Sequence, residues 1–318
     1  MIKGLKQYWP TIRPIINTAN YFANRYHKKI WLIGDGRSGT TWVSSLINVN
    51  RRYRELFEPF NPKFNPQYAN LMQPNQYLRP DSNNTEILSL ATNIFTGKIN
   101  INKVDEANNS LFYDGLLIKD IFSNLFVKWA INHFPELKVV FLIRNPFDVA
   151  LSKQNLKHWN WLIDPTNFLT QQTLMDDYLS PYYDLIASIE DDFILKQILT
   201  WSILHYVPFK MIEPNDAYPV FYEELVNDPV FQVKQLRMQL GINSDGIEDK
   251  LHKAITKTSR TQRTSRASDN PGYWKNEIPG KTIDASFRIL EEFNLLHLYD
   301  FNTSMPVHSH FRAIYGKH

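Results

Sequence analysis

The segment that most constrains the fold is residues 30–47, with the sequence IWLIGDGRSGTTWVSSLI. It reads as a buried strand at Ile30–Ile33, a glycine-broken loop at Gly34–Gly39 and a helix with an apolar face. Such a loop aims backbone N–H groups at one point ahead of the helix and so makes an anion site. The Walker pattern of nucleoside triphosphatases has Lys directly after its last glycine. Here Thr40 stands there and the cation, Arg37, lies inside the loop, so we expect a phosphate-bearing ligand other than Mg-ATP.

Further apolar runs predict the fold class. They are continuous rather than alternating, as in strands that are buried on both faces of a parallel sheet, and helical patterns separate them. The predicted strands are Ile30–Ile33, Leu116–Ile118, Val139–Ile143 and Val220–Tyr222, and the predicted helices are Ser123–His133 and Asp192–Phe209. Alternating strands and helices predict an α/β fold: a single doubly wound domain with a central parallel sheet flanked by helices, like that of the P-loop NTPases.

Composition narrows the classes of protein further. Of the 318 residues, 43% are hydrophobic, which is enough for a sizeable core and argues against a disordered chain. The net charge of +3 is too small to predict a nucleic-acid partner. The absence of cysteine excludes disulfides and thiolate metal sites. No apolar run approaches the roughly 18 residues that predict a transmembrane helix.

Residues 1–29 form a basic N-terminal arm ahead of a domain at 30–318. No acidic residue precedes Asp35, and apolar residues recur at helical spacing, interrupted by Pro10 and Pro14. We interpret the arm as a helix that packs on the domain, and peripheral contact with a membrane or a partner is the alternative. Within the domain we expect insertions around the acceptor site near 59–110, which includes an irregular loop at Asn61–Asn84, and near 159–190.

Two more segments carry polar groups at positions that suit phosphate binding. The run Val139–Ser152 is a buried strand that ends in Arg144, and Ser152 lies on the following helix. Ligands bind at the carboxyl ends of strands in open α/β sheets, so Arg144 and Ser152 are candidate phosphate ligands. The alternative is that Arg144 pairs with a nearby carboxylate such as Asp148. The basic, Ser- and Thr-rich run Lys250–Ser268 either is a solvated face or wraps a polyanion.

Taken in order, four segments resemble the sulfotransferase family, whose donor is 3′-phosphoadenosine 5′-phosphosulfate (PAPS). Arg37–Trp42 resembles the family's 5′-phosphosulfate loop, and the run from Arg144 to Ser152 resembles its 3′-phosphate motif. The segment Tyr222-Glu-Glu-Leu resembles the family's Tyr-Glu-Asp-Leu, whose Tyr lies near the adenine. Gly272-Tyr-Trp-Lys275 is similar to the Gly-x-Trp-Lys end of its 3′-phosphate loop.

The resemblance implies a set of donor-binding residues. The 5′-phosphosulfate would lie against Arg37, Ser38, Gly39, Thr40, Thr41 and Trp42, and Trp42 would also stack on the adenine. The 3′-phosphate would be held by Arg144, Ser152 and one arginine of the basic run, with Gly272 in the adjoining loop. Arg260, Arg263 and Arg266 remain rivals because the family's Arg-Lys-Gly triplet is absent. Tyr222 and Thr258-Ser259 would contact the adenine.

The base is a separate question. Phenol and steroid sulfotransferases use a His in a Lys-Thr-His segment, but the corresponding residues here are Lys119-Asp-Ile121. The segment Leu56-Phe-Glu-Pro-Phe60 is similar to the Glu-Pro segment of carbohydrate sulfotransferases, which implies that Glu58 is the general base. The alternative is a loop Glu58 in a salt bridge with a neighbouring arginine (Arg51, Arg52 or Arg54). Asp120 and His158 are reserve bases.

The function expected from these motifs is sulfuryl transfer to an acceptor hydroxyl of a carbohydrate or other aliphatic alcohol. Arg37 and Lys119 would neutralise the charge that develops on the leaving phosphate. The donor is already activated, so no metal is expected. Two alternatives stay open, a P-loop kinase-like phosphotransferase and a non-catalytic module that binds nucleotides or polyanions. The acceptor is expected to be a small molecule or glycan, and the location cytoplasmic.

Overall fold

The computed structural model describes residues 8–156, 164–261 and 272–315. Its centre is a five-stranded sheet in the order β2-β3-β1-β4-β5, and every neighbouring pair is parallel. The strands are β1 (Lys29–Gly34), β2 (Tyr53–Phe57), β3 (Gly115–Lys119), β4 (Leu137–Ile143) and β5 (Ala217–Phe221). After β1 the chain forms the edge strand β2 and then β3, which lies between β2 and β1, before it crosses to β4 and β5 on the other side of β1. The doubly wound α/β fold expected from the sequence is therefore confirmed.

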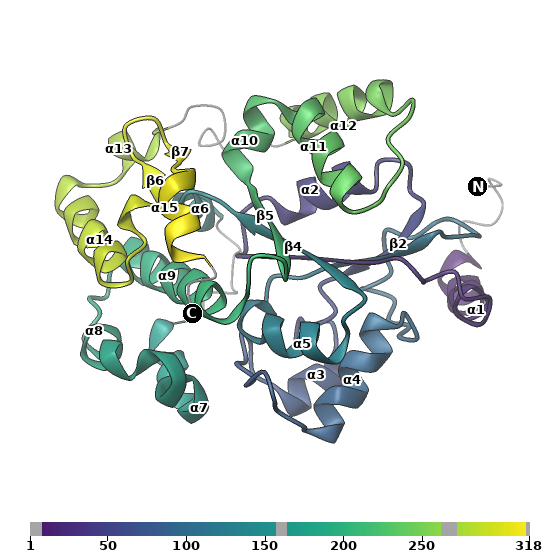
Figure 1. The fold of residues 1–318 in the computed structure, drawn as a ribbon, viewed down its shortest axis with the longest axis horizontal. Helices are drawn as coiled ribbons and strands as arrows, with labels where there is room; N and C mark the ends of the chain where they lie inside the picture. The colour runs from purple at the N-terminus through teal and green to yellow at the C-terminus, as the bar shows by residue number, and fades with distance from the viewer. Residues whose placement is uncertain (1–7, 157–163, 262–271, 316–318) are drawn as a thin grey trace.

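Helices cover both faces of this sheet (Figure 1). Above it in that view lie α2 (Thr40–Ile47), α10 (Tyr222–Asn227), α11 (Pro229–Gln239) and α12 (Glu248–Thr261). Below it lie α3 (Pro66–Leu71), α4 (Thr85–Phe95) and α5 (Val127–His133). Beyond β5 are α6 (Pro146–Gln154), α7 (Gln172–Leu174), α8 (Tyr183–Ala187), α9 (Phe193–Met211), α13 (Trp274–Glu277), α14 (Gly280–Glu292), α15 (His308–Ile314) and the pair β6 (Tyr299–Asp300) and β7 (Met305–Pro306). At the opposite edge lies α1 (Trp9–Phe22).

The core explains why β1 is apolar at every position. Trp31 and Ile33 belong to the larger hydrophobic cluster on one face of the sheet, and Ile30 and Leu32 belong to the cluster on the other face. Successive side chains of a strand point to opposite faces, so a strand that is covered on both sides needs no polar position.

The strand β2 was not predicted, and its sequence shows why. Its residues Tyr53-Arg-Glu-Leu-Phe57 include two charged side chains, which is unusual for a strand in a covered sheet. Arg54 is fully buried, but it donates to Asp105 Oδ1 at 2.8 Å and to the carbonyls of Gly97 and Ile99. The guanidinium therefore finds its partners inside the fold.

Two other sequence interpretations change. Tyr222 does not end a strand but is the first residue of α10. Asn61–Asn84 is not wholly irregular, because it contains α3. The aromatic side chains Phe60, Tyr68 and Tyr77 in this region are buried at 2% exposure or less, so they belong to the core.

The parallel register places the ends of four strands at one edge. Leu32 of β1 pairs with Lys119 of β3, and Phe57 of β2 pairs with the same Lys119. Gly34 of β1 pairs with Leu142 of β4. The residues that follow these strands therefore meet at the carboxyl edge of the sheet, where ligands bind in open α/β folds.

Candidate active site

The loop after β1 is a strained turn that leads into α2. Gly39 caps α2 with a φ of 99°, and a Cβ there would lie 2.5 Å from the ring of Tyr222. Arg37 also has a left-handed φ of 71°, which is costly for a residue with a side chain. Ser38 closes the turn by donating its hydroxyl to the Asp35 carbonyl at 2.6 Å. The first N–H groups of α2 have no partner within the helix, so the loop and helix offer an anion site.

Two arginines meet beside this loop. Arg37 Nε donates to Ser152 Oγ at 3.1 Å, and Arg144 Nη1 donates to the Arg37 carbonyl at 3.0 Å. Burial lowers the pKa of Arg37, and the neighbouring Arg144 lowers it further. Arg144 is 6% exposed and its Nε has no hydrogen-bond partner among the described residues. Two close guanidinium groups favour a bound anion, such as a phosphate.

The alternative for Arg144 was an ion pair with Asp148, and the structure does not form it. No ion pair joins these two described residues, and Asp148 Oδ1 has no hydrogen-bond partner among the described residues. Instead the Arg144 guanidinium lies over the ring of Tyr222, 4.3 Å from its centroid. Tyr222 also contacts Trp42 edge to face, with the ring centroids 5.5 Å apart. Three predicted donor-site side chains therefore lie together at the start of α2 and α10.

Of the remaining residues predicted for the donor site, the structure describes Gly272 but not the side chains of the candidate arginines. Gly272 has a φ of 86°, and it leads into α13, whose Trp274 stacks on Phe147 of α6 at 4.2 Å between centroids. This contact brings the Gly272 segment beside the helix that carries Ser152. Arg260 lies in the last turn of α12, but its side chain is outside the described part of the chain, as are Arg263, Arg266 and His158. Which arginine would serve the 3′-phosphate stays a prediction.

Glu58 and Lys119 form a buried pair at the ends of β2 and β3. Lys119 Nζ lies 2.5 Å from Glu58 Oε1, and the two side chains are 2% and 10% exposed. Asn61 Nδ2 donates to Glu58 Oε2 at 2.9 Å. Glu58 has a φ of 50°, a left-handed conformation that its own N–H fixes by donating to the Lys119 carbonyl at 2.7 Å. Both oxygens of this carboxylate are therefore oriented, as a general base requires.

The expected alternative for Glu58 was a salt bridge with a neighbouring arginine, and it is wrong. Arg54 pairs with Asp105, and Arg52 pairs with Asp114. No ion pair is found for the Arg51 side chain among the described residues. The partner is the lysine of the next strand, which sequence spacing alone does not place.

Asp120, a reserve base, has a structural position instead. It is fully buried and accepts the N–H of Phe60 at 2.9 Å and the N–H of Phe122 at 2.7 Å. Burial raises the pKa of Asp120 to about 7. These bonds fix the turn that carries Glu58, so Asp120 supports the candidate base rather than replacing it.

Sequence reasoning missed the buried pair of Asp35 and Lys153. Lys153 Nζ lies 2.7 Å from Asp35 Oδ2, and both side chains are at most 5% exposed. The pair ties the loop after β1 to α6, next to Ser152. The sequence shows an acidic residue, Asp35, in the loop and a lysine directly after the predicted Ser152. It cannot show that they pair, because no periodicity links positions so far apart.

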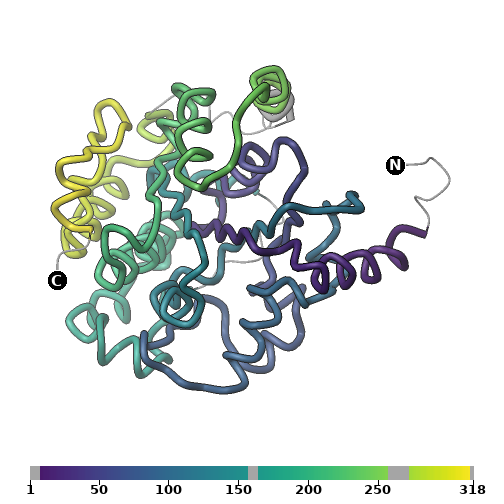
Figure 2. Tube along the Cα trace, turned by 45° about the vertical axis from the view of Figure 1, so that its right-hand side comes forward, coloured from purple at the N-terminus to yellow at the C-terminus, as the bar shows by residue number. Residues whose placement is uncertain are grey.

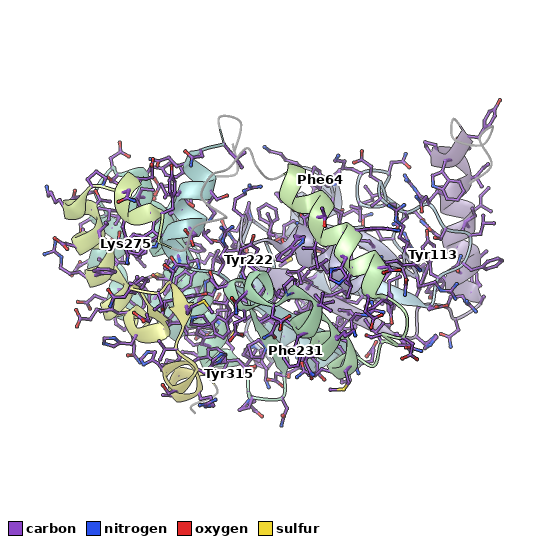
Figure 3. The ribbon with its side chains drawn as sticks, turned by 90° about the horizontal axis from the view of Figure 1, so that it is seen from above. Phe64, Tyr113, Tyr222, Phe231, Lys275 and Tyr315 are labelled. Atoms are coloured by element: carbon purple, nitrogen blue, oxygen red, sulfur yellow. The ribbon has the colours of Figure 1, made fainter. Side chains whose placement is uncertain are left out.

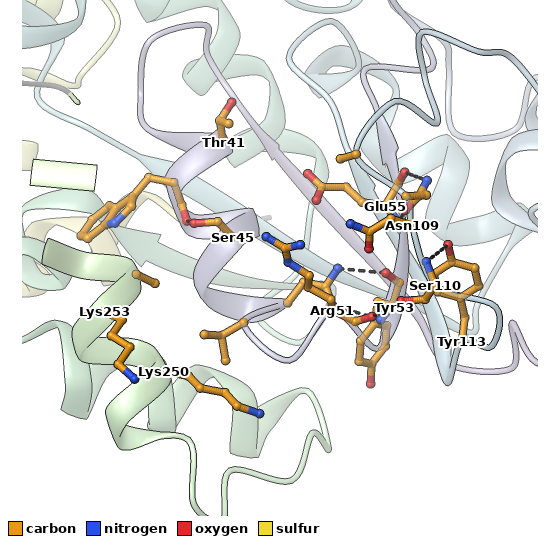
Figure 4. A pocket seen from close by; sticks show the side chains of 16 residues that line it. Thr41, Ser45, Arg51, Tyr53, Glu55, Asn109, Ser110, Tyr113, Lys250 and Lys253 are labelled. Carbon is orange, nitrogen blue, oxygen red and sulfur yellow. Dashed lines mark hydrogen bonds between the residues drawn. The ribbon is translucent and has the colours of Figure 1, made fainter. Parts of the chain in front are cut away.

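A groove of about 860 Å³ runs along α2 from the candidate donor loop (Figure 4). Thr41 and Ser45 of α2 line one wall, and Lys250 and Lys253 project from α12. The opposite side holds Tyr53 and Glu55 of β2, together with Asn108, Asn109, Ser110 and Tyr113 from the segment before β3. Glu55 accepts the Ser44 hydroxyl at 2.6 Å, and burial raises its pKa. Sequence analysis did not identify this groove, because its walls come from four separate segments.

Two buried carboxyl groups lie behind Arg144. Burial raises the pKa of Asp148 to about 6, against the attraction of Arg144, and it raises the pKa of Glu223 to about 7. Glu223 accepts the N–H of Asn145 at 2.8 Å and the hydroxyl of Tyr299 at 3.0 Å. Asp148 Oδ1 accepts no such hydrogen bond from the described residues. Replacing the carboxylate of Asp148 by an amide therefore leaves fewer donors without a partner than the same change at Glu223 would.

Asp148→Asn should make the protein less sensitive to rising pH. The folded-state pKa of Asp148 lies above the unfolded value of about 4, so the stability linked to its proton is complete below about pH 4 and is lost as pH rises through about 6. The free energy of unfolding of the variant, relative to wild type, should increase by roughly 3 kcal/mol across this window. Urea unfolding without nucleotide at both ends of the window measures this, and parallel pH profiles would contradict it.

Similarity to known proteins identifies the family of this chain. Among curated protein sequences, none is significantly similar to the chain. Several solved structures that it resembles at low identity are sulfotransferases. A sulfotransferase domain from the curacin biosynthetic pathway is 14% identical with a TM-score of 0.44, covering 83% of this chain and 96% of that one. A sulfotransferase from Alicyclobacillus acidocaldarius is 11% identical with a TM-score of 0.38, covering 73% and 91%.

Mouse sulfotransferase SULT7A1, solved in complex with PAP, is 14% identical with a TM-score of 0.42, covering 87% of this chain and 90% of that one. Similarities with identity and TM-score this low are a resemblance and carry no inference about function. The model of the sulfotransferase family matches residues 29–246, from β1 to the turn before α12, and so covers the whole central sheet. The chain belongs to the sulfotransferase family.

Proposed function

We propose that this enzyme transfers the sulfuryl group of PAPS to a hydroxyl of a carbohydrate or another aliphatic alcohol. The observation that carries the proposal is the buried, oriented Glu58–Lys119 pair, which stands at the same sheet edge as the loop with Arg37 and Arg144. A base and a cation beside an anion loop are what transfer of a charged group to a hydroxyl requires.

The donor would lie across the start of α2. The N–H groups of Thr40, Thr41 and Trp42, with Arg37 and Ser38, would hold its 5′-phosphosulfate. Arg144 and Ser152 would hold the 3′-phosphate, and Trp42 and Tyr222 would enclose the adenine. The fit is supported by the unpartnered Nε of Arg144 and by the Tyr222 ring, which packs so closely on Gly39 that a Cβ there would lie 2.5 Å from it.

Glu58 acts as the base in this proposal. It takes the proton from the acceptor hydroxyl while the acceptor oxygen forms a bond to sulfur. The bond between sulfur and the bridging oxygen breaks, and that oxygen leaves with its electron pair on 3′-phosphoadenosine 5′-phosphate (PAP). Lys119 and Arg37 stabilise the charge on the leaving phosphate. Lys119 also holds the Glu58 carboxylate in place before the acceptor arrives.

The groove beside α2 is the proposed acceptor site. It starts at Thr41, next to the candidate donor loop, and is lined by Tyr53 and Glu55 of β2, the strand that precedes Glu58. Its amides and hydroxyls suit the hydroxyls of a sugar, and the rings of Tyr53 and Tyr113 suit a sugar's apolar face. Arg51, Lys250 and Lys253 add positive charge, which favours an acceptor that is itself anionic.

A P-loop kinase-like activity is less well supported. Thr40 stands where a triphosphatase has its lysine, and it is buried. Asp120, the carboxylate at the end of β3, is fully buried and accepts the N–H groups of Phe60 and Phe122, which suits a structural role better than magnesium binding. No metal is needed in the proposed reaction. Among the described helices none is long and apolar enough to cross a membrane, and a cytoplasmic location stays a prediction.

Glu58→Gln should lower kcat at least about a hundredfold, because the amide cannot accept the acceptor's proton. The affinity for PAP should change little, since the donor loop is untouched. Transfer of labelled sulfuryl groups to a panel of hydroxylated glycans, combined with PAP titration, measures both.

Glu106→Gln is the matched control for this change. Glu106 is an exposed glutamate whose pair with Lys103 is on the surface, so the control should keep full activity. Near-full activity of Glu58→Gln would contradict the assignment of the base. Absence of transfer to every acceptor by the wild-type enzyme, with PAP bound, would instead contradict the proposed acceptor class.

Lys253→Glu should weaken catalysis for acidic acceptors selectively. Lys253 lines the groove and forms no ion pair among the described residues, so its reversal changes the charge of the groove directly. We expect kcat/KM to fall about tenfold for a uronic-acid-containing glycan and less than about twofold for a neutral one. Lys281→Glu, at an exposed position on α14, is the control. Equal losses for both acceptors would contradict the groove assignment.

A further inference from the structure

The groove beside α2 holds a single carboxyl group among its described lining residues, that of Glu55. Its cations are Arg51 and, on α12, Lys250 and Lys253, so positive groups outnumber the one negative group. Glu55 forms no ion pair with any described residue. A carboxylate that lines a groove and pairs with none of the cations around it is available to a ligand.

The direction of the Glu55 side chain follows from its place in β2. Alternate residues of a strand point to the same face, so Tyr53, Glu55 and Phe57 share one face of β2. Tyr53 belongs to the hydrophobic cluster that contains the apolar side chains of α2, whereas Leu56 belongs to the cluster on the other face of the sheet. The hydroxyl of Ser44 on α2 donates to Glu55 Oε1 at 2.6 Å. Glu55 therefore points from β2 toward α2.

The two oxygens of the Glu55 carboxyl group have different surroundings. Oε1 accepts the hydroxyl of Ser44, which is fully buried, so this bond fixes the orientation of the carboxyl group. The backbone is fixed as well, because the Glu55 N–H donates to Asn108 Oδ1 at 2.8 Å and Asn108 Nδ2 donates to the Glu55 carbonyl at 2.7 Å. Oε2 accepts no hydrogen bond from the described residues and is not a buried atom. It is therefore an oriented acceptor that is open to the groove.

The same face of β2 links this acceptor oxygen to the candidate base. Lys119 Nζ, which contacts Glu58, lies 4.4 Å from the centroid of the Phe57 ring. Burial raises the pKa of Glu55, and the Ser44 hydroxyl and the nearby charge of Lys119 oppose this rise. A ligand that reaches Glu55 is therefore near the Glu58–Lys119 pair, where the transfer is proposed to occur.

The lysines lie on the other wall of the groove. In Figure 1 and Figure 2, α12 lies beside α2, and Lys250 and Lys253 project from α12. The lining also includes Trp42, which contacts Tyr222, and Tyr113, which in Figure 3 lies apart from Tyr222 toward the α1 end of the molecule. One wall of the groove therefore offers a hydrogen-bond acceptor, and the opposite wall offers positive charge.

We propose that Glu55 is a specificity-determining residue whose Oε2 accepts a hydroxyl of an anionic acceptor, while Lys250 and Lys253 attract the negative group of the same molecule. An ammonium group also suits a carboxylate, but the cations of the groove disfavour it. A carboxylate has no hydrogen to donate, so at this point it selects a hydroxyl over a carbonyl or ether oxygen. The proposal rests on the proposed sulfuryl transfer and adds the orientation of the acceptor to it.

Glu55→Gln tests the role of this carboxylate. The Ser44 hydroxyl keeps the side-chain oxygen as its acceptor, so the amide NH2 of the variant faces the groove and replaces an acceptor by a donor. With methyl β-D-glucuronide as the acceptor, KM should rise about tenfold, while kcat changes less than about threefold and the affinity for PAP stays the same. Glu106→Gln, at an exposed position, is the control and should match wild type.

Monodeoxy analogues of methyl β-D-glucuronide separate a contact from a structural effect. Loss of one hydroxyl other than the sulfated one should raise KM about tenfold in wild type and less than about twofold in Glu55→Gln, which has already lost that contact. Equal effects of every analogue on both proteins, or a loss confined to kcat, would overturn the proposal.

A comparison of two sugars needs wild type alone and so holds even if the variant is unstable. Methyl β-D-glucoside has the same ring without the carboxylate, and wild type should use it at least about tenfold less efficiently than the glucuronide. Equal use of the two sugars, or transfer only to acceptors without a negative group, would overturn the proposal. Transfer to no hydroxylated acceptor despite bound PAP would instead contradict the proposed function on which it rests.

Discussion

The parallel alignment of β2, β3, β1 and β4 is the constraint on which the candidate site depends. No single strand forms the candidate site, because the residues that follow the four strands are far apart in sequence. The register places Phe57 beside Lys119, Lys119 beside Leu32, and Gly34 beside Leu142. Glu58, Lys119 and the loop after β1 therefore meet without any need for an insertion to carry them. A slip of one residue would turn the Lys119 side chain to the other face of the sheet.

Buried polar contacts then hold this edge in one arrangement. The Asp35–Lys153 pair and the bond from Arg37 to Ser152 join the loop to α6, while Asp120 fixes the turn at Glu58. Buried ion pairs contribute modestly to stability because desolvation offsets their attraction, but they restrict geometry. The left-handed backbone at Arg37 and Glu58 persists because these contacts determine it. Strain of this kind, at both the anion loop and the candidate base, is typical of a functional site.

Much of the fold followed from the sequence, for physical reasons. A strand covered on both faces is apolar at every position, so β1, β3 and β4 were predicted to within two residues of their ends. The strand β2 was missed because the partners of its Arg54 come from residues 97–105, and local sequence does not reveal such a long-range pairing. Tyr222 was assigned to a strand because a tyrosine after an apolar run suits either element.

The candidate site was predicted unevenly for the same reason. Residues within one motif, such as Arg37 to Trp42, could be named because the loop is local. The partner of Glu58 could not, because any of three nearby arginines suits a salt bridge as well as Lys119 does. The groove beside α2 depends on which faces meet in three dimensions. Periodicity alone gives the existence of an apolar face and not its direction.

The most direct test of the account is calorimetric titration of the wild-type protein with PAP and with ATP, each in the presence and absence of magnesium. A site built from Arg37, Arg144 and the start of α2 should bind PAP with micromolar affinity that magnesium does not change, and Mg-ATP at least about a hundredfold more weakly. Tight, magnesium-dependent binding of ATP, with weak binding of PAP, would contradict the central claim that this loop holds a sulfuryl donor.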